Sequence, residues 1–353
     1  MPNWLNIELG LALVALCAWP VFQWCFRNLP NERWQFAAIL PSPSRQQTDH
    51  DWIGTNITFY GVISALAYAA ATAAFVFLCG SIGQPLWPTL AFIGLMLAVC
   101  IPASKLIARW VEGGNVNFTV GSAAFAGALL MPVALFVSAR IATDGFNAIA
   151  LIAAAGLAYV LGEAIGRFGC LSFGCCYGCR LSDVGPLQQA LYGSTATTYR
   201  GQLKKISYAS NMENTPVVPV QSIASVVLFA LFLLGLWLFW RQNFAACALL
   251  VVWGSQSWRI YSETLRADYR GGSKVSAYQW MALATCVITT VTVLTASINE
   301  ASVAPSSLAG WASLGRVDVL IAIQGLAVAI VWFMGRSQVT GALVNLRLFR
   351  ERL

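Results

Sequence analysis

Long apolar stretches separated by shorter polar ones dominate the sequence. A transmembrane helix needs about 20 consecutive apolar residues to cross the hydrocarbon core of a bilayer. The pattern predicts nine such helices, at Leu9–Phe26, Phe59–Cys79, Leu86–Ala103, Phe118–Ala139, Phe146–Leu161, Val220–Trp240, Phe244–Trp258, Ala277–Ile298 and Val319–Met334. The two shortest stretches, 146–161 and 244–258, are expected to continue into the polar residues that follow. Nine spans place the two termini on opposite faces of a membrane.

Two polar stretches are too long to be simple connectors. The first covers residues 27–57, and the second, residues 168–217, lies between the fifth and sixth spans. We name residues 168–217 the head segment. The sequence therefore predicts an all-α polytopic membrane protein with about nine transmembrane helices and a polar head segment between the fifth and sixth.

Composition supports this class. Of 353 residues, 58% are hydrophobic and only 10% are charged, whereas a soluble domain carries about a quarter charged residues. No Asp, Glu, Lys or Arg occurs between Trp52 and Ser104. These features exclude a soluble enzyme, and they exclude a transmembrane barrel because its strands alternate over about ten residues. The net charge is +7, but no basic stretch is interleaved with aromatic residues, so we expect no nucleic acid partner.

Charged residues near the ends of uncharged spans mark candidate chemical sites, because charge is costly at membrane depth. Glu163 and Arg167 lie four residues apart at the end of one span, so on a helix they share a face and can pair. Arg259 and Glu263 repeat this spacing at the end of another span, followed by Arg266. Two arginines at equivalent depth form a pair of fixed cations suited to a phosphodiester.

A third candidate site is a glycine-rich segment at residues 110–121. Gly113 and Gly114 would let backbone amides approach an anionic headgroup. Each of the three sites, taken alone, also has an ordinary structural explanation. Arginines at helix ends extend to lipid phosphates, Glu and Arg four apart neutralise each other, and glycine pairs form turns.

Several short motifs follow one another along the chain. They are TFYGVISAL (58–66), EGGNVNFTVG (112–121), GRFGCLSFGCCYG (166–178), PVQ (219–221), RIYSETLR (259–266) and QWM (279–281). In this order they resemble landmarks of the bacterial prolipoprotein diacylglyceryl transferases, namely a first helix, a Gly-Gly motif, a Gly-Arg-x-Gly-Asn signature, a His-Pro-x-Gln segment, an Arg-x-x-x-Glu-x-x-Arg motif and a last helix. The chain resembles a cysteine-rich divergent branch of that superfamily.

The resemblance divides the chain into three parts. Residues 55–297 correspond to a seven-helix core that contains the head segment. Residues 1–54 add an N-terminal transmembrane helix and a polar loop. Residues 298–353 add a C-terminal transmembrane helix and a basic tail.

The resemblance also implies an activity. The family transfers diacylglycerol from phosphatidylglycerol, its phospholipid donor, to a cysteine thiol of a lipoprotein precursor at the bacterial cytoplasmic (inner) membrane, with no cofactor and no metal. Arg167 and Arg259 match two arginines that hold the phosphate, and Glu263 matches the acid that positions the second. The other matched positions imply a lipid-binding set, which is Gly113, Gly114, Gly166, Gly169, Gln221 and Arg266.

Several positions depart from the family pattern. Thr119 stands where the family has a histidine that activates the thiol, and the chain's only histidine is His50. A threonine hydroxyl does not take up a proton near neutral pH. Cys170 replaces the asparagine of the signature, Cys175 the following acid, and Val218 the histidine of the His-Pro-x-Gln segment. The positions that handle phosphate are thus kept while the base is not, so the acceptor can differ from the family's thiol.

Four of the ten cysteines, namely Cys170, Cys175, Cys176 and Cys179, fall within ten residues. They admit three interpretations, a packing feature, a metal site, or a redox pair of Cys176 and Cys179. No second Cys/His cluster or cysteine pair accompanies them in the sequence, so we favour packing. Two alternative functions stay open, a membrane thiol-disulfide oxidoreductase and a non-catalytic lipid-binding homologue.

The distribution of basic residues predicts the orientation. Threading nine spans places Arg140, Arg241 and Arg316 on one face and the other 18 of the 21 basic residues on the face of the head segment. Cytoplasmic loops are enriched in Lys and Arg. The sequence therefore predicts a cytoplasmic head segment, whereas the family resemblance implies an active site on the exported face.

Overall fold

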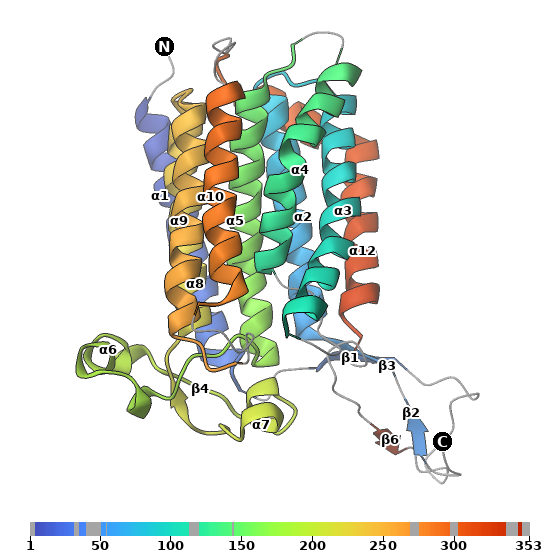
Figure 1. The fold of residues 1–353 in the computed structure, drawn as a ribbon. Coiled ribbons are helices and arrows are strands. Elements are labelled where there is room, and N and C mark those ends of the chain that lie inside the picture. Colours follow the sequence, from blue (N-terminus) through green and yellow to red (C-terminus); the bar gives the residue numbers. More distant parts are fainter. Residues whose placement is uncertain are drawn as a thin grey trace.

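The protein is a bundle of long helices. The computed structural model describes residues 4–31, 35–39, 51–53, 55–112, 120–142, 145–268, 275–296, 303–336 and 345–347. In these residues nine helices of 18 residues or more run side by side (Figure 1). They are α1 (Trp4–Asn28), α2 (Phe59–Ser81), α3 (Leu86–Glu112), α4 (Val120–Ile141), α5 (Ala148–Phe173), α8 (Val220–Trp240), α9 (Phe244–Thr264), α10 (Ala277–Ala296) and α12 (Val317–Met334).

The expected class, an all-α polytopic membrane protein, is confirmed. Within the described ranges, eight of the nine long helices have the length and apolar composition to cross a membrane. The exception is α9, whose second half carries polar residues that include Gln256, Arg259 and Glu263. Its neighbours α8 and α10 lie alongside it in the bundle (Figure 1).

Helix boundaries differ from the apolar runs where polar residues enter the bundle. The fifth run was expected over 146–161, but α5 continues to Phe173, so Glu163 and Arg167 lie within the helix. The first six residues of the predicted head segment, 168–173, accordingly belong to α5. Likewise α9 extends past Trp258 to Thr264. These extensions agree with the expected continuation of the two short runs.

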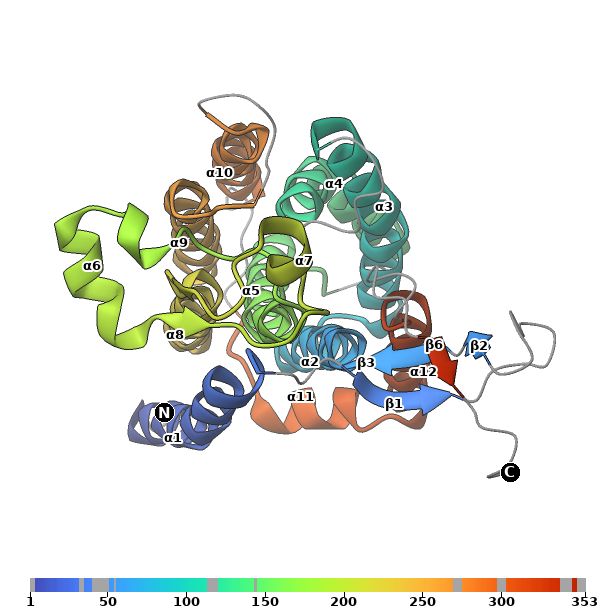
Figure 2. The same cartoon turned by 90° about the horizontal axis from the view of Figure 1, so that it is seen from below.

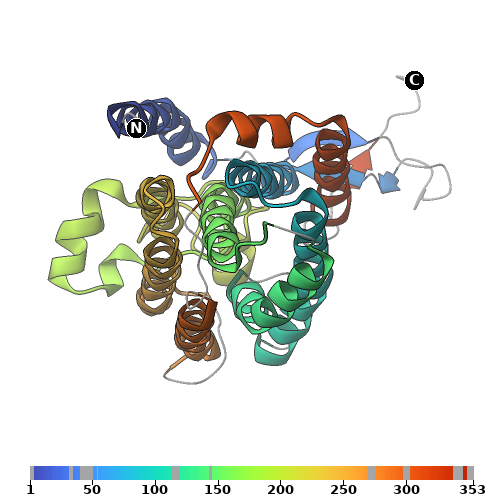
Figure 3. The same cartoon turned by 90° about the horizontal axis from the view of Figure 1, so that it is seen from above.

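One helix was not expected from the apolar pattern. Helix α11 (Ser307–Leu314) begins at Ser306, whose Oγ accepts a hydrogen bond from the amide of Ala309. It lies across α2 near the end of the bundle opposite the head segment, as Figure 3 shows from above. There Trp311 packs against Phe77 of α2 with ring centroids 5.0 Å apart.

Helix α5 forms the centre of the bundle. It packs against α2, α8 and α9, and 67% of its most apolar 18-residue stretch is buried, against 11% for the corresponding stretches of α1, α3 and α12. Close packing depends on small residues on its neighbours. A side chain on Gly235 of α8, for example, would lie 2.8 Å from Leu157 of α5 and 2.6 Å from Val251 of α9. The most buried helix is therefore the one that carries Glu163 and Arg167.

The head segment covers one end of α5, α8 and α9, as Figure 2 shows from below. It contains short helices α6 (Pro186–Tyr192) and α7 (Lys205–Ser210), the 3₁₀ turns η2 (Leu181–Asp183) and η3 (Gly193–Thr195), and an antiparallel pair of two-residue strands, β4 (Thr197–Thr198) and β5 (Pro216–Val217). Lys204 is fully buried and donates hydrogen bonds to the carbonyls of Leu29 and Ser172. These bonds connect the head segment to the ends of α1 and α5.

Two further pairs of short strands lie at the same end of the molecule as the head segment (Figure 1). Antiparallel β1 (Gln35–Ile39) and β3 (Thr55–Thr58) form one pair, and β2 (Asp51–Ile53) and β6 (Asn345–Arg347) form the other. Helix α1 begins at the opposite end of the bundle, whereas α12 ends at the same end as the head segment (Figure 1).

Candidate functional site

Two arginines from different helices share one buried carboxylate. Arg167 of α5 and Arg259 of α9 both donate from Nη2 to Oε1 of Glu163, and the Arg259 bond is 2.6 Å long. The three side chains are at most a tenth exposed. Glu163 and Arg167 lie one helical turn apart on α5, as their spacing predicted. The partner of Arg259, 96 residues away in sequence, is supplied by the packing of α9 on α5.

Two neutral side chains complete this arrangement. The Tyr159 hydroxyl accepts hydrogen bonds from Arg259 Nη2 and Gln256 Nε2, both 3.1 Å long. Neither Tyr159 nor Gln256 was predicted as a site residue, although the sequence carries a signal for Tyr159. Tyr159, Glu163 and Arg167 recur at intervals of four on α5, and such residues share a helical face. We call Tyr159, Glu163, Arg167, Gln256 and Arg259 the arginine cluster.

The arginine cluster has unused hydrogen-bonding capacity. Nε of Arg167, Nε of Arg259 and Oε2 of Glu163 are buried and have no hydrogen-bond partner among the described residues. Two guanidiniums against one carboxylate leave a net charge of +1 (two minus one). Buried polar groups are almost always hydrogen-bonded, so unpartnered N–H donors with a net positive charge suit an anionic ligand.

The glycine-rich segment ends beside Arg259. A side chain on Gly121, near the start of α4, would lie 3.2 Å from Arg259 Nη1 and 3.2 Å from the Tyr278 ring. Glycine at this position therefore makes room for the guanidinium. The predicted site residues Gly113, Gly114 and Thr119 lie outside the described residues, as does His50.

A second group of charges surrounds Arg266 at the end of α9. Its guanidinium pairs with both carboxylate oxygens of Asp268, at 2.8 and 2.5 Å, and with Glu263 Oε1 at 3.3 Å. Glu263 also accepts a hydrogen bond from Ser276 Oγ. The acid that binds Arg259 directly is Glu163, while Glu263 binds Arg266.

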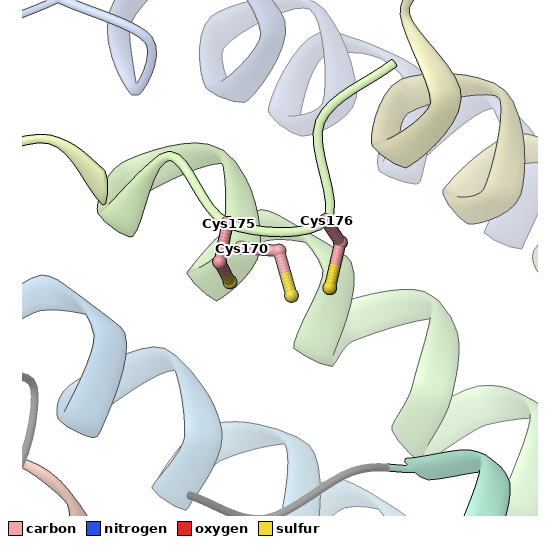
Figure 4. A group of neighbouring side chains, drawn as sticks. All are labelled: Cys170, Cys175 and Cys176. Carbon is pink, nitrogen blue, oxygen red and sulfur yellow. The ribbon is translucent and has the colours of Figure 1, made fainter. Parts of the chain in front are cut away.

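Three of the four clustered cysteines meet at the end of α5. The Sγ atoms of Cys170, Cys175 and Cys176 all lie within 4.8 Å of one another, and Figure 4 shows the three sulfurs on the same side of the turn. Helix α5 ends at Phe173, and the chain reverses at the following Gly174, which has a φ of 70° and donates a hydrogen bond from its amide to the Cys170 carbonyl. Cys176 also has a positive φ, 57°. Hydrogen bonding to its two neighbours, together with burial, raises the pKa of the Cys175 thiol.

Cys179 does not belong to this group. Its Sγ lies 3.5 Å from the Arg266 carbonyl, and its amide donates to the Leu265 carbonyl at 2.8 Å. The Val218 amide in turn donates to the Cys179 carbonyl. The segment after the three cysteines is thus fixed between the ends of α8 and α9.

The remaining predicted lipid-binding residues lie at helix contacts. Gln221 is fully buried and donates from Nε2 to the Cys175 carbonyl at 2.7 Å. A side chain on Gly169 would lie 3.3 Å from Tyr60, and one on Gly166 would touch Ala67 at 4.0 Å, both on α2. Close approach of α2 to α5 accounts for glycine at position 169.

Comparison with known families identifies the family of this chain. The family model described as prolipoprotein diacylglyceryl transferase matches residues 52–295, more than half of the chain. The chain belongs to the prolipoprotein diacylglyceryl transferase family. Among curated proteins, no sequence matches it. The family match includes all the residues of the arginine cluster and leaves α1, α11 and α12 outside.

Membership in the prolipoprotein diacylglyceryl transferase family and the eight apolar helices identify a multi-pass membrane protein. The family acts in lipid modification of lipoproteins, which supports a membrane transferase with a phospholipid donor and a lipoprotein acceptor.

Proposed function

We propose that this protein transfers a diacylglyceryl group from phosphatidylglycerol in the bacterial inner membrane, with Arg167 and Arg259 binding the phosphate of the donor. The observation that carries the proposal is the pair of guanidiniums fixed on one carboxylate, each with an unpartnered Nε–H. A phosphodiester carries one negative charge, which matches the net charge of +1 of the arginine cluster.

The same geometry suits departure of the phosphate. In the transfer, the acceptor nucleophile forms a bond to the glycerol carbon of the diacylglyceryl group. The bond between that carbon and the phosphate oxygen breaks, and glycerol phosphate leaves as an anion. Fixed donors that are already oriented stabilise charge as it develops, without reorganisation at the moment of reaction. Glu163 holds both arginines in place, so we assign it to positioning and the two arginines to contact with the phosphate.

The acceptor side of the reaction differs from the family pattern. A nucleophile must lose its proton, and position 119 carries threonine in place of the family's histidine. Tyr177 is a poor replacement because burial raises the pKa of its hydroxyl, which is 2.5 Å from Ser210 Oγ. We therefore propose that the acceptor is activated differently from the cysteine of an exported lipoprotein precursor.

Lipid analysis of cells tests the proposal. Cells that express the wild-type protein should consume phosphatidylglycerol and accumulate a diacylglyceryl product, and Arg167→Ala or Arg259→Ala should abolish that change. Lysine at either position should restore little, because a point charge does not reproduce the guanidinium fork. Arg140→Ala is the matched control, since Arg140 ends α4 at the opposite end of the bundle. Unchanged product in both alanine variants would contradict the proposal.

A further inference from the structure

We propose that Cys170, Cys175 and Cys176 form a zinc-binding site at the end of α5. The three Sγ atoms lie within 4.8 Å of one another. Two sulfurs bound to one Zn²⁺ at about 2.3 Å in tetrahedral geometry are roughly 3.8 Å apart. Small side-chain rotations therefore suffice to bring all three sulfurs to one ion.

The backbone at this turn brings the three thiols together. Gly174 in the left-handed conformation ends α5 and reverses the chain, so Cys175 and Cys176 return to the last turn of the helix, where Cys170 lies. Cys176 itself has φ 57°, which is unfavourable for a residue with a side chain. Surrounding contacts fix the turn, because Gln221 binds the Cys175 carbonyl and the Cys179 amide binds the Leu265 carbonyl.

The chemistry of the donors selects the ion. Three sulfur donors exclude Mg²⁺ and Ca²⁺, which prefer oxygen, and favour Zn²⁺ or Cu⁺. Three thiolates would leave a net charge of −1 around Zn²⁺ and −2 around Cu⁺. The smaller residual charge is less costly at the end of an apolar bundle, so we assign zinc.

The donor count also defines the kind of site. Within the described residues, no fourth cysteine, histidine or carboxylate joins the group. Zinc sites with three protein ligands keep a fourth position for water or a substrate atom. Each of the three cysteine residues keeps part of its surface exposed. The proposal does not depend on the proposed lipid transfer.

Zinc binding by the purified full-length protein in detergent, under reducing conditions, tests the site. The wild type should bind one equivalent of Zn²⁺ with three sulfur ligands by X-ray absorption, and Co²⁺ should give thiolate-to-cobalt charge-transfer absorption. Stoichiometric zinc binding should be lost in each of three single variants, Cys170→Ser, Cys175→Ser and Cys176→Ser. Cys179→Ser is the matched control and should keep it, because its sulfur lies outside the group.

Thermal unfolding separates loss of the site from loss of the fold. Added Zn²⁺ should raise the Tm of the wild type and of Cys179→Ser, since a ligand that binds only the native state stabilises it, and should leave the Tm of the three cluster variants unchanged. Arg167→Ala should retain zinc, which distinguishes this site from the arginine cluster. Absence of stoichiometric zinc in the reduced wild type, or retention of zinc in all three cluster variants, would overturn the proposal.

Discussion

At the scale of single residues, the arginine cluster is a charged group inside an apolar bundle. Burial of charge is costly unless each group is paired and hydrogen-bonded. Oxygen Oε1 of Glu163 meets this requirement for both arginines at once. The arginine cluster still lacks one negative charge and has two unpartnered Nε–H groups. An anionic lipid would supply that charge and accept hydrogen bonds from these groups.

The central role of Glu163 gives a prediction for stability. Glu163→Gln removes the only negative charge of the arginine cluster and leaves two buried guanidiniums uncompensated, which should destabilise the fold by about 3–5 kcal/mol. Thermal unfolding in detergent measures the loss. Added phosphatidylglycerol should restore part of the stability, whereas neutral diacylglycerol should not. A variant as stable as the wild type would show that Glu163 does not hold the two arginines.

Sequence alone could predict only the local part of this site. The pairing of Glu163 with Arg167 follows from a spacing of four on one helix. The attachment of Arg259 to Glu163 could not be predicted, because it depends on how α9 packs on α5. Spacing alone does not decide the partner of Arg259, because Glu263 lies four residues away on the same helix while the ion pair is with Glu163.

At the scale of helices, glycine sets how closely the helices approach. Gly61 of α2 faces Gly335 at the end of α12, and a side chain on Gly61 would lie 2.0 Å from the Gly335 Cα. The Gly335 carbonyl also accepts hydrogen bonds from the amide and Oγ1 of Thr58, both 2.9 Å long. The end of α12 is therefore held against the start of α2 by direct contacts of the Gly335 backbone with Thr58 and Gly61.

The close contact between Gly61 and Gly335 predicts that adding one methyl group at Gly61 destabilises the protein. Gly61→Ala should destabilise the protein by about 1–3 kcal/mol, as overpacking does, and should lower the Tm in detergent. Gly325→Ala on α12 is the control, because a side chain there meets nothing within 4 Å. Alanine also favours a helix over glycine by up to about 1 kcal/mol, so the control should match or exceed the wild type. Equal stability of the two variants would contradict the close contact.

Apolar length predicted the long helices well, and it placed both ends of five of them within two residues, namely α2, α4, α8, α10 and α12. All nine expected spans correspond to long helices, because about 20 apolar residues leave few alternatives in a bilayer. Helix α11 was missed because eight residues are too short for a spanning signal. Helices α5 and α9 extend beyond their apolar runs because the polar residues at their ends, such as Arg167 and Arg259, face other helices.

At the scale of the whole molecule, the main prediction concerns orientation. Arg140, Arg241 and Arg316 end or begin helices at one end of the bundle, and the head segment lies at the other (Figure 1). The positive-inside rule then predicts a cytoplasmic head segment, in contrast to the exported active site that the family implies. Thiols on the cytoplasmic side stay reduced, which the proposed zinc site requires.

A reporter fused after Leu353 tests the orientation. The C-terminal end of α12 lies on the face of the head segment (Figure 1), so a reporter active only in the cytoplasm should give signal. A reporter active only on the exported side, fused at the same position, is the control and should be silent. The opposite pair of results would contradict this orientation and place the head segment on the exported face, as the family implies.

Binding of the donor lipid tests the central claim most directly, since it needs no knowledge of the acceptor. Purified wild type, Arg167→Ala, Arg259→Ala and the control Arg140→Ala would each be titrated with phosphatidylglycerol and with neutral diacylglycerol. Charge-assisted hydrogen bonds contribute about 1.5–3 kcal/mol. Arg167→Ala and Arg259→Ala should therefore each bind phosphatidylglycerol roughly 10- to 150-fold more weakly than the wild type. Affinity for diacylglycerol should not change. Wild-type affinity for phosphatidylglycerol in both Arg167→Ala and Arg259→Ala would contradict the claim that this arginine pair binds the donor phosphate.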